Sequence, residues 1–191
     1  MNLRDLVLKN RSYRRFDESY AISREELVSF VDLARHSASA RNAQPLKYIL
    51  SWTPERNALI FPCLAWAAYL KNWKGPDEGE RPSAYIVMLG DTEISNQYFC
   101  DHGIAAQSIL LGATEKGYGG CIIGSVNKEL LYKNLGIPQR YEILQVIALG
   151  KPAENVVIEP MPSDGDYKYW RDEQNVHHVP KRSLEELILN L

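Results

Sequence analysis

Two continuous apolar segments limit most strongly what this chain can fold into. Ala84–Leu89 is rich in β-branched and aromatic residues and is closed by Gly90 and Asp91, and Ile143–Leu149 is a second such run. Short runs of this kind predict buried strands. The helices predicted around them are few and unevenly spaced. We therefore expect an α+β layered fold with a mostly antiparallel or mixed sheet, and not a doubly wound parallel one.

Several helices can be placed from their caps and apolar spacing. Ser23 and Glu26 form a capping-box pattern that begins one helix, and the apolar stretch Asn57–Tyr69 predicts a largely buried second one. The longest helix is expected from about Gln97 to Lys116. Its stripe of small and apolar residues would permit close helix packing, in a dimer or in a tight core. The stripe consists of Ile104, Ala105, Ser108, Leu111 and Gly112.

Composition excludes several classes of protein. The 191 residues carry a net charge of −2, which argues against a nucleic-acid binder. The longest apolar run, near Ala58–Leu70, is too short to span a bilayer, and the N-terminus has no signal-peptide pattern. Three separated cysteines without CxxC spacing suit a reducing compartment. We expect a cytoplasmic protein with no membrane or nucleic-acid partner. The Pro-rich loop Glu159–Asp166 leaves too little chain after it for a second domain, so we expect residues 1–191 to form a single domain.

Basic residues gather near both ends of this slightly acidic chain. The segment Arg11–Phe16 places three arginines around Ser12, which by itself would suit a solvated turn. Lys181 and Arg182, however, stand directly before a predicted helix N-terminus, where cations are unfavourable unless an anion is present. Guanidinium forks with a hydroxyl donor are what a phosphate dianion requires. The two segments together predict a phosphate site.

Two further segments have features of a site for a flat ligand. In the loop Ser39–Pro45, the carboxamides of Asn42 and Gln44 could match the donors and acceptors of a heteroaromatic ring edge. In Gly119–Ser125, a Gly-rich strand end would let the backbone approach a planar ligand closely. Each feature alone is weak evidence.

In their order along the chain, these segments resemble the nitroreductase family of flavoproteins. The resemblance rests on Arg11–Phe16, the loop Ser39–Pro45, Gly119–Ser125, the turn Gly150–Pro152 and Lys181–Arg182, and it spans nearly the whole chain. It implies an α+β sandwich with a central, mostly antiparallel sheet flanked by helices. It also implies an intertwined homodimer with FMN at the interface, in which the long helix forms the dimer core.

The resemblance also implies which residues would hold FMN. The phosphate and ribityl chain would be bound by Arg11, Ser12, Arg14, Lys181 and Arg182. From the partner subunit, the flavin would be lined by Ser37, Ala38, Ser39 and Asn42. Backbone N–H groups of Gly124 and Ser125 would face the flavin N5 edge, and Asn42, Arg14 or Arg15 could stabilise the reduced ring. Two positions depart from the family pattern, because Leu46 replaces a common aromatic residue and Ala38 a common proline.

The implied activity is reduction of nitroaromatic, quinone or related small-molecule acceptors by NADH or NADPH, in a ping-pong mechanism. No catalytic side chain is required, because the flavin N5 accepts and donates the hydride. One alternative is a flavin-binding relative with another redox task, such as flavin destruction, dehalogenation or ring dehydrogenation. The other is a non-enzymatic protein that binds a phosphorylated ligand.

The pair His177–His178 could suggest a metal site. Adjacent strand residues point to opposite faces, so both cannot readily bind one ion, and no third ligand has a suitable spacing. We therefore predict surface positions for both histidines and no metal site.

Overall fold

The computed structural model describes residues 1–190. Its main sheet has the strand order β1-β5-β3-β2, with β4 also paired to β5, and every pairing in it is antiparallel. This confirms the predicted sheet type. The strands are β1 (Phe16–Asp17), β2 (Leu46–Ser51), β3 (Ala84–Asp91), β4 (Gly119–Ile123) and β5 (Tyr141–Pro152).

Strand β3 is the centre of the core. All eight of its residues are buried, because β2 and β5 flank it and helices cover both faces. The strand continues past the predicted stop to Asp91. Gly90 does not end it; a Cβ there would lie 2.2 Å from the ring of Tyr98, so this glycine permits close packing.

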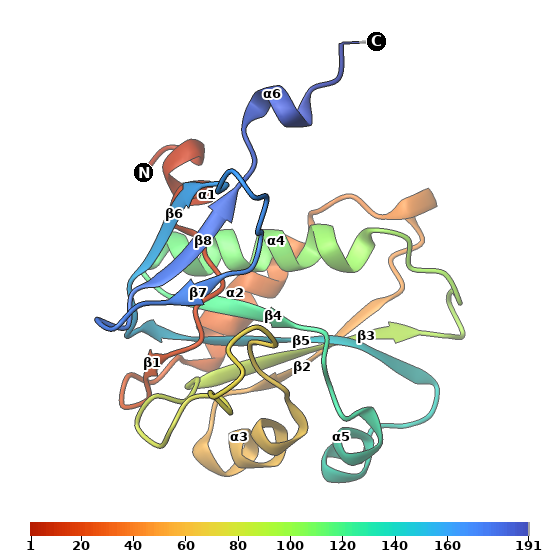
Figure 1. Ribbon diagram of the computed structural model, residues 1–191. Coiled ribbons are helices and arrows are strands. Elements are labelled where there is room, and N and C mark those ends of the chain that lie inside the picture. The colour runs from red at the N-terminus through yellow and green to blue at the C-terminus, as the bar shows by residue number, and fades with distance from the viewer. Residues whose placement is uncertain (191) are drawn as a thin grey trace.

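Helices form a layer on each face of the main sheet (Figure 1). Side chains from α2 and α4 contribute to one apolar cluster, and side chains from α3 and α5 to the other. The two layers and the sheet confirm the α+β sandwich. The helices are α1 (Leu3–Lys9), α2 (Arg24–Arg35), α3 (Pro54–Ile60), α4 (Asp101–Glu115), α5 (Lys128–Leu135) and α6 (Leu184–Leu187). No helix within residues 1–190 is long and apolar enough to cross a membrane.

Local sequence explains the start of α2 and the contact between α2 and α4. The Ser23 hydroxyl accepts from the Glu26 N–H at 3.2 Å, and Glu26 accepts from the Ser23 N–H at 2.9 Å, which confirms the capping box. Helix α4 begins at Asp101, later than predicted. A Cβ at Gly112 would lie 2.4 Å from Leu33 on α2, so part of the small-residue stripe is used for packing within the chain.

The prediction of a buried helix over Asn57–Tyr69 was wrong in extent. Helix α3 starts at Pro54 with a Thr53 cap and ends at Ile60, and a 3₁₀ turn follows at Phe61–Cys63. Proline at position 62 ends the helix, because it has no N–H to donate and its ring clashes with the preceding turn. The chain from Leu64 onwards is irregular up to β3.

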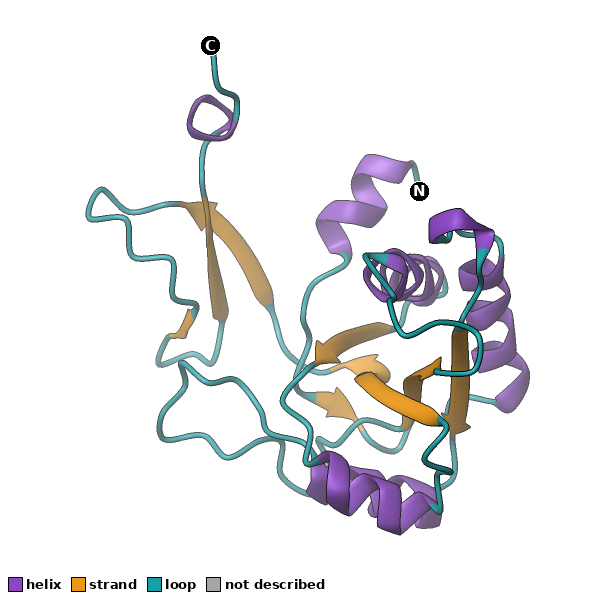
Figure 2. Cartoon of the chain, turned by 90° about the vertical axis from the view of Figure 1, so that its right-hand side faces the viewer, coloured by secondary structure: helices purple, strands orange, loops and turns teal. Residues whose placement is uncertain are grey.

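A second, smaller sheet stands beside the main one (Figure 2). Its order is β6-β8-β7, formed by Val156–Pro160, His177–Lys181 and Trp170–Arg171, and β6 runs parallel to β8. The predicted loop Glu159–Asp166 therefore begins as a strand, and Pro160 is tolerated because β6 is an edge strand. Helix α6 then leaves the body of the protein (Figure 1).

We predict that Gly120→Ala destabilises the fold. A Cβ at this position in β4 would lie 2.7 Å from the backbone oxygen of Ala148 and 2.6 Å from Leu110, so the strand must shift. Overpacking of this kind costs about 2 kcal/mol of unfolding free energy. Urea unfolding of the purified protein measures this change.

Gly124→Ala is the matched control for this substitution. No atom lies within 4 Å of a Cβ at Gly124, and its φ is not positive. Its unfolding free energy should change by less than about 0.5 kcal/mol. Equal losses in the two variants would contradict the packing explanation.

Candidate functional site

The basic segment Arg11–Phe16 is fixed to the main sheet at two points. The Tyr13 N–H donates to the Gly120 oxygen at 3.0 Å, and Ser12 forms a bridge with the same glycine. Phe16, which is fully buried, pairs with Pro152 on β5. The segment is therefore held on the edge of the core and is not a free surface turn.

Glu154 anchors the same segment from the other side. Its side chain is 1% exposed and accepts from Arg171 at 2.9 Å. The second carboxylate oxygen accepts the backbone N–H groups of Arg14 and of Arg15, the latter at 3.2 Å. A buried carboxylate thus fixes the backbone that carries the arginines.

Strand β8 closes over this segment and forms a cavity of about 260 Å³, here called the basic cavity. Figure 1 shows the N-terminal chain running beneath β8. Four residues predicted to bind phosphate line the cavity together: Arg11, Ser12, Arg14 and Lys181. Residues from near both ends of the chain therefore meet at one place.

The cations of the basic cavity have no anionic partner within residues 1–190. Arg11, Arg14 and Lys181 form no ion pair among residues 1–190. Arg11 donates to the Val7 oxygen at 2.7 Å, but its Nε is buried without a partner, and burial lowers its pKa. A buried charge normally needs a counter-ion. The cavity therefore suits an anionic ligand, and a phosphate group fits its donor set.

His177, which we predicted to lie at the surface, is buried beside Arg14. Its Nε2 lies 3.2 Å from Arg14 Nη1, and because a guanidinium only donates, Nε2 must accept. Burial lowers the pKa of His177 to about 4, and the nearby Arg14, Arg171 and His178 add to this effect. The histidine is therefore neutral near pH 7 and helps to hold Arg14. The surface prediction was wrong because β8 is paired on both sides and its inner face covers the cavity.

Sequence reasoning missed other residues of the basic cavity. Tyr169 lies under the Arg14 guanidinium, 4.6 Å from ring centroid to Cζ, and Asn10 contacts Gln107 at 3.5 Å. The alternation His177, Val179, Lys181 could have indicated one shared strand face. No local pattern could have placed Tyr169, because it lies on a connection without regular structure.

Two cations from the predicted clusters face elsewhere. Arg182 does not line the basic cavity; its side chain is half exposed and pairs with Glu186 at 2.9 Å on α6. Arg15 is paired with Glu80, with its Nε 2.6 Å from the carboxylate. Both guanidinium groups are therefore already neutralised by acidic side chains.

The predicted flavin loop lines a different cavity in the same chain. Ser39 donates to Asp101 at 2.6 Å, and the Ala40 N–H donates to the same carboxylate at 2.9 Å, which ties the loop to the start of α4. Ser37, Ala38 and Ser39 line this loop cavity of about 310 Å³, whereas Asn42 does not. Asn42 is exposed with φ of +53°.

Gly124 and Ser125 follow β4 directly and are exposed. Their N–H groups donate no hydrogen bond within the described part of the chain. Ile122, two residues earlier, lines the basic cavity and is 41% exposed. The C-terminal end of β4 thus offers an apolar side chain and free backbone N–H donors to a ligand.

We predict that His178 makes the stability of the second sheet depend on pH. Its ring contacts Glu159 at 3.0 Å and Asp172 at 3.2 Å, and it stacks on Trp170. Partial burial lowers the pKa of His178, but the hydrogen bonds and charges of the two carboxylates outweigh this and raise it. The resulting stability is fully present below the unfolded pKa of about 6.5 and is lost as pH rises through the folded pKa.

Imidazole titration by NMR, with unfolding at several pH values, tests this prediction. His178 should titrate above about pH 6.5, whereas His177 should stay neutral down to about pH 4. The stability difference between wild type and His178→Gln should shrink at high pH. A His178 that titrates below the ordinary value would contradict the assignment. Residues 1–190 contain no group of His, Cys, Asp or Glu arranged to hold a metal ion.

Comparisons of the sequence and of the structure with known proteins point to one family. Residues 7–151 match the sequence profile of the Nitroreductase family. The chain is 27% identical over 180 residues to "Putative NAD(P)H nitroreductase YodC" of Bacillus subtilis, covering 78% of this chain and 89% of that protein. It superposes on a nitroreductase family protein of Streptococcus pneumoniae with a TM-score of 0.70 at 18% identity, with full coverage of both chains. A structure from Exiguobacterium sibiricum in complex with FMN has a TM-score of 0.65 at 20% identity, covering 81% of this chain and 90% of that one.

Proposed function

The chain belongs to the nitroreductase family, and from this premise we propose that it is an FMN-dependent oxidoreductase. It would use NADH or NADPH to reduce nitroaromatic, quinone or related acceptors by a ping-pong mechanism. The observation that carries the proposal is the basic cavity, where Arg11, Arg14 and Lys181 converge without an anionic partner in residues 1–190.

Residues of the basic cavity would hold the phosphate end of FMN. Arg11, Arg14 and Lys181 supply charge, and the Ser12 hydroxyl supplies a further donor. Ile122 would support the apolar face of the ring, while the N–H groups of Gly124 and Ser125 would donate to its edge. His177 would act through Arg14, because its neutral ring accepts from that guanidinium and orients it.

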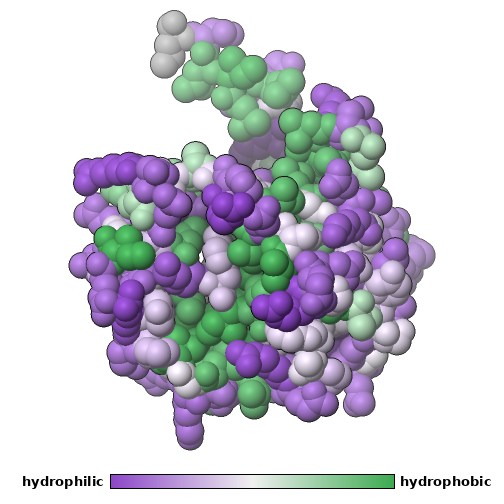
Figure 3. All heavy atoms as spheres, turned by 180° about the vertical axis from the view of Figure 1, so that it is seen from behind, coloured by the Kyte–Doolittle hydropathy of each residue, from purple (hydrophilic) through white to green (hydrophobic). Residues whose placement is uncertain are grey.

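A second copy of the chain would complete the site. Within one chain, the loop that carries Ser37, Ala38, Ser39 and Asn42 does not reach the basic cavity. A homodimer with FMN at the interface would bring the loop of one copy to the basic cavity of the other. Exposed apolar residues on α6 and directly after it support such an interface, since Leu184, Leu187 and Ile188 are at least 60% exposed (Figure 3).

When it is bound, FMN supplies the redox chemistry by taking up and giving back a hydride at N5. The protein needs no acid or base side chain for this and contributes binding, orientation and charge. Free backbone donors near the ring edge would favour the reduced form electrostatically. The acceptor would enter from the side that the basic cavity leaves open.

Flavin uptake and nicotinamide oxidation test the proposed activity. We expect purified protein to bind FMN and, under anaerobic conditions, its flavin absorbance to bleach on addition of NADH or NADPH and to return on addition of a quinone. Flavin that binds but stays oxidised would favour a relative with a different redox task. Protein that does not bind FMN would leave only the non-enzymatic binder of a phosphorylated ligand.

Light scattering of the flavin-loaded protein tests the proposed dimer. We expect the mass of two chains, and we expect Leu187→Glu, in the exposed apolar part of α6, to weaken dimerisation. Glu185→Lys is a matched control on the same short helix, because it changes an exposed acidic residue. A monomer that retains tightly bound FMN would contradict the interface site.

The cysteines support a reducing compartment. Cys63 and Cys121 are buried, Cys100 is exposed, and all three are free. Free thiols are typical of intracellular proteins. We therefore propose a cytoplasmic enzyme.

A further inference from the structure

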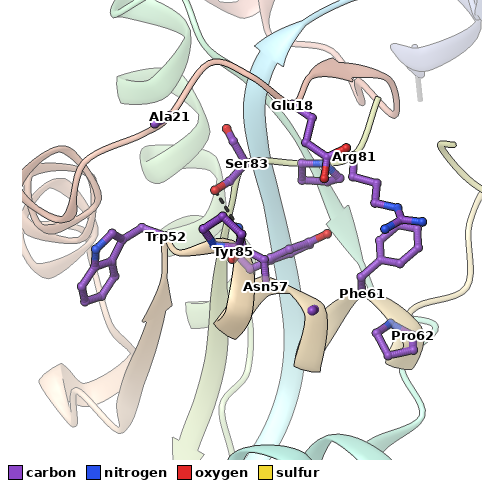
Figure 4. Close-up of a pocket in the computed structure, with 12 residues that line it drawn as sticks. Glu18, Ala21, Trp52, Asn57, Phe61, Pro62, Arg81, Ser83 and Tyr85 are labelled. Carbon is purple, nitrogen blue, oxygen red and sulfur yellow. Dashed lines mark hydrogen bonds between the residues drawn. The ribbon is translucent and has the colours of Figure 1, made fainter. Parts of the chain in front are cut away.

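A third cavity, of about 320 Å³, lies beside α3 and is separate from the other two. We call it the α3 cavity (Figure 4). It shares no lining residue with the basic cavity or the loop cavity. Its volume is at the lower end of the range for small-molecule sites, so a ligand with one ring would fit.

Two buried hydrogen-bond donors on residues that line this cavity have no partner within residues 1–190. Tyr85 is 1% exposed and lines the cavity. Ser83 is 8% exposed, and its Oγ and the buried Nε of Arg81 have no hydrogen-bond partner within residues 1–190. Burial raises the pKa of Tyr85 far above its usual range, so the phenol remains a donor. Leaving such groups unpaired costs about 1–3 kcal/mol each, and a ligand acceptor would remove that cost.

A structural side chain holds these donors in place. Asn57 on α3 donates to the Ser83 carbonyl at 2.8 Å and accepts from the Ser51 hydroxyl at 2.8 Å. Figure 4 shows the first of these bonds as a dashed line. Since Asn57 has both of its polar atoms engaged, it fixes the wall of the cavity and leaves ligand binding to its neighbours.

Two flat groups stacked on each other form another wall of the cavity. The Arg81 guanidinium lies over the ring of Phe61, with 4.7 Å from Cζ to the centroid. Figure 4 shows Arg81 above Phe61, with Ser83 and Tyr85 beside them toward the middle of the view. A planar ring can therefore occupy the space between Phe61 and Tyr85, with an acceptor group directed to the donors.

The charges in the cavity limit the class of ligand. Arg81 forms no ion pair among the described residues, while Glu18 is the one acid that lines the cavity and accepts from the Gly79 N–H at 2.6 Å. Arg81 is the one cation among the described residues that line the cavity, so its single unpaired charge suits a monoanion, while the Glu18 carboxylate on the same cavity disfavours a dianion. We propose that the α3 cavity binds a small aromatic monocarboxylate, with its carboxylate on Arg81, Ser83 and Tyr85 and its ring against Phe61.

Calorimetric titration of flavin-loaded protein with benzoate tests this site. We expect saturable binding of one benzoate per chain that leaves the flavin absorbance unchanged. Arg81→Met should weaken it at least about tenfold, since a charged hydrogen bond is lost. Tyr85→Phe should also weaken it, because this substitution deletes the phenol donor.

Controls make the test specific. Arg56→Met removes an exposed arginine from α3, the helix beside the cavity, and should leave benzoate affinity unchanged. Benzamide has the same shape without the charge and should bind more weakly, and inorganic phosphate should not compete. Any one of three results would overturn the proposal: no benzoate binding at millimolar concentration, full affinity in Arg81→Met, or binding that perturbs the flavin spectrum and thus occurs at the flavin site.

Discussion

Replacing Arg11 with alanine is expected to weaken FMN binding at least about tenfold while leaving riboflavin binding nearly unchanged. The Arg11 guanidinium lines the basic cavity, and its Nε is buried without a partner. A hydrogen bond to a charged group contributes about 1.5–3 kcal/mol, and riboflavin lacks the phosphate that would accept it. Fluorescence titration of the apoprotein with the two flavins measures the difference.

Two other arginines serve as comparisons. Arg4→Ala, on the exposed side of α1, should leave the affinities for both flavins unchanged. Arg182→Ala should have a much smaller effect than Arg11→Ala, because Arg182 is already paired with Glu186. Equal weakening of FMN and riboflavin in Arg11→Ala would exclude a phosphate contact, and a larger effect at Arg182 would show that the C-terminal segment rearranges on binding.

Removing the Glu154 side chain is expected to have the largest effect on stability. Glu154→Ala leaves the Arg171 guanidinium, itself only 10% exposed, without its partner, and frees the N–H groups of Arg14 and Arg15. Breaking one side of a buried ion pair costs about 3 kcal/mol or more. The midpoint of urea unfolding of the apoprotein should fall accordingly.

Two substitutions separate charge from position. Glu154→Gln keeps an acceptor of the same shape for the two N–H groups. It should therefore lower the unfolding free energy less than Glu154→Ala does. Glu78→Ala, in an exposed loop, should change the unfolding free energy by less than about 0.5 kcal/mol. If alanine at position 154 were as stable as wild type, the carboxylate would not anchor the basic segment.

Much of the main sheet could be predicted from local pattern. The buried strands over Ala84–Leu89 and Ile143–Leu149 and the capped helix α2 are present, because continuous apolar runs and capping residues act over a few neighbours. The extent of α3 was missed because an apolar stretch was given more weight than Pro62, which cannot continue a helix.

The second sheet and part of the candidate site could not be predicted from local pattern. Strand β6, which ends at Pro160, pairs in parallel with β8, which begins at His177, and such pairing between separated segments leaves little trace in either sequence. The burial of His177 follows from this pairing. The convergence of Arg11, Arg14 and Lys181 was suggested by their chemistry, whereas the pairing of Arg182 and Arg15 with nearby acids depends on side-chain geometry.

The basic cavity is built from both ends of the chain, and this has a consequence for biosynthesis. In a ribosome-bound chain in which β8 has not yet been synthesised, Arg11 and Arg14 are present but His177 and Lys181 are missing. The proposed phosphate site is then incomplete. If FMN binds as proposed, its phosphate contact with Lys181 would form only after β8 has been synthesised. For the same reason, we expect proteolytic removal of the segment that contains β8 to weaken the proposed flavin binding, so the yellow colour would report an intact β8.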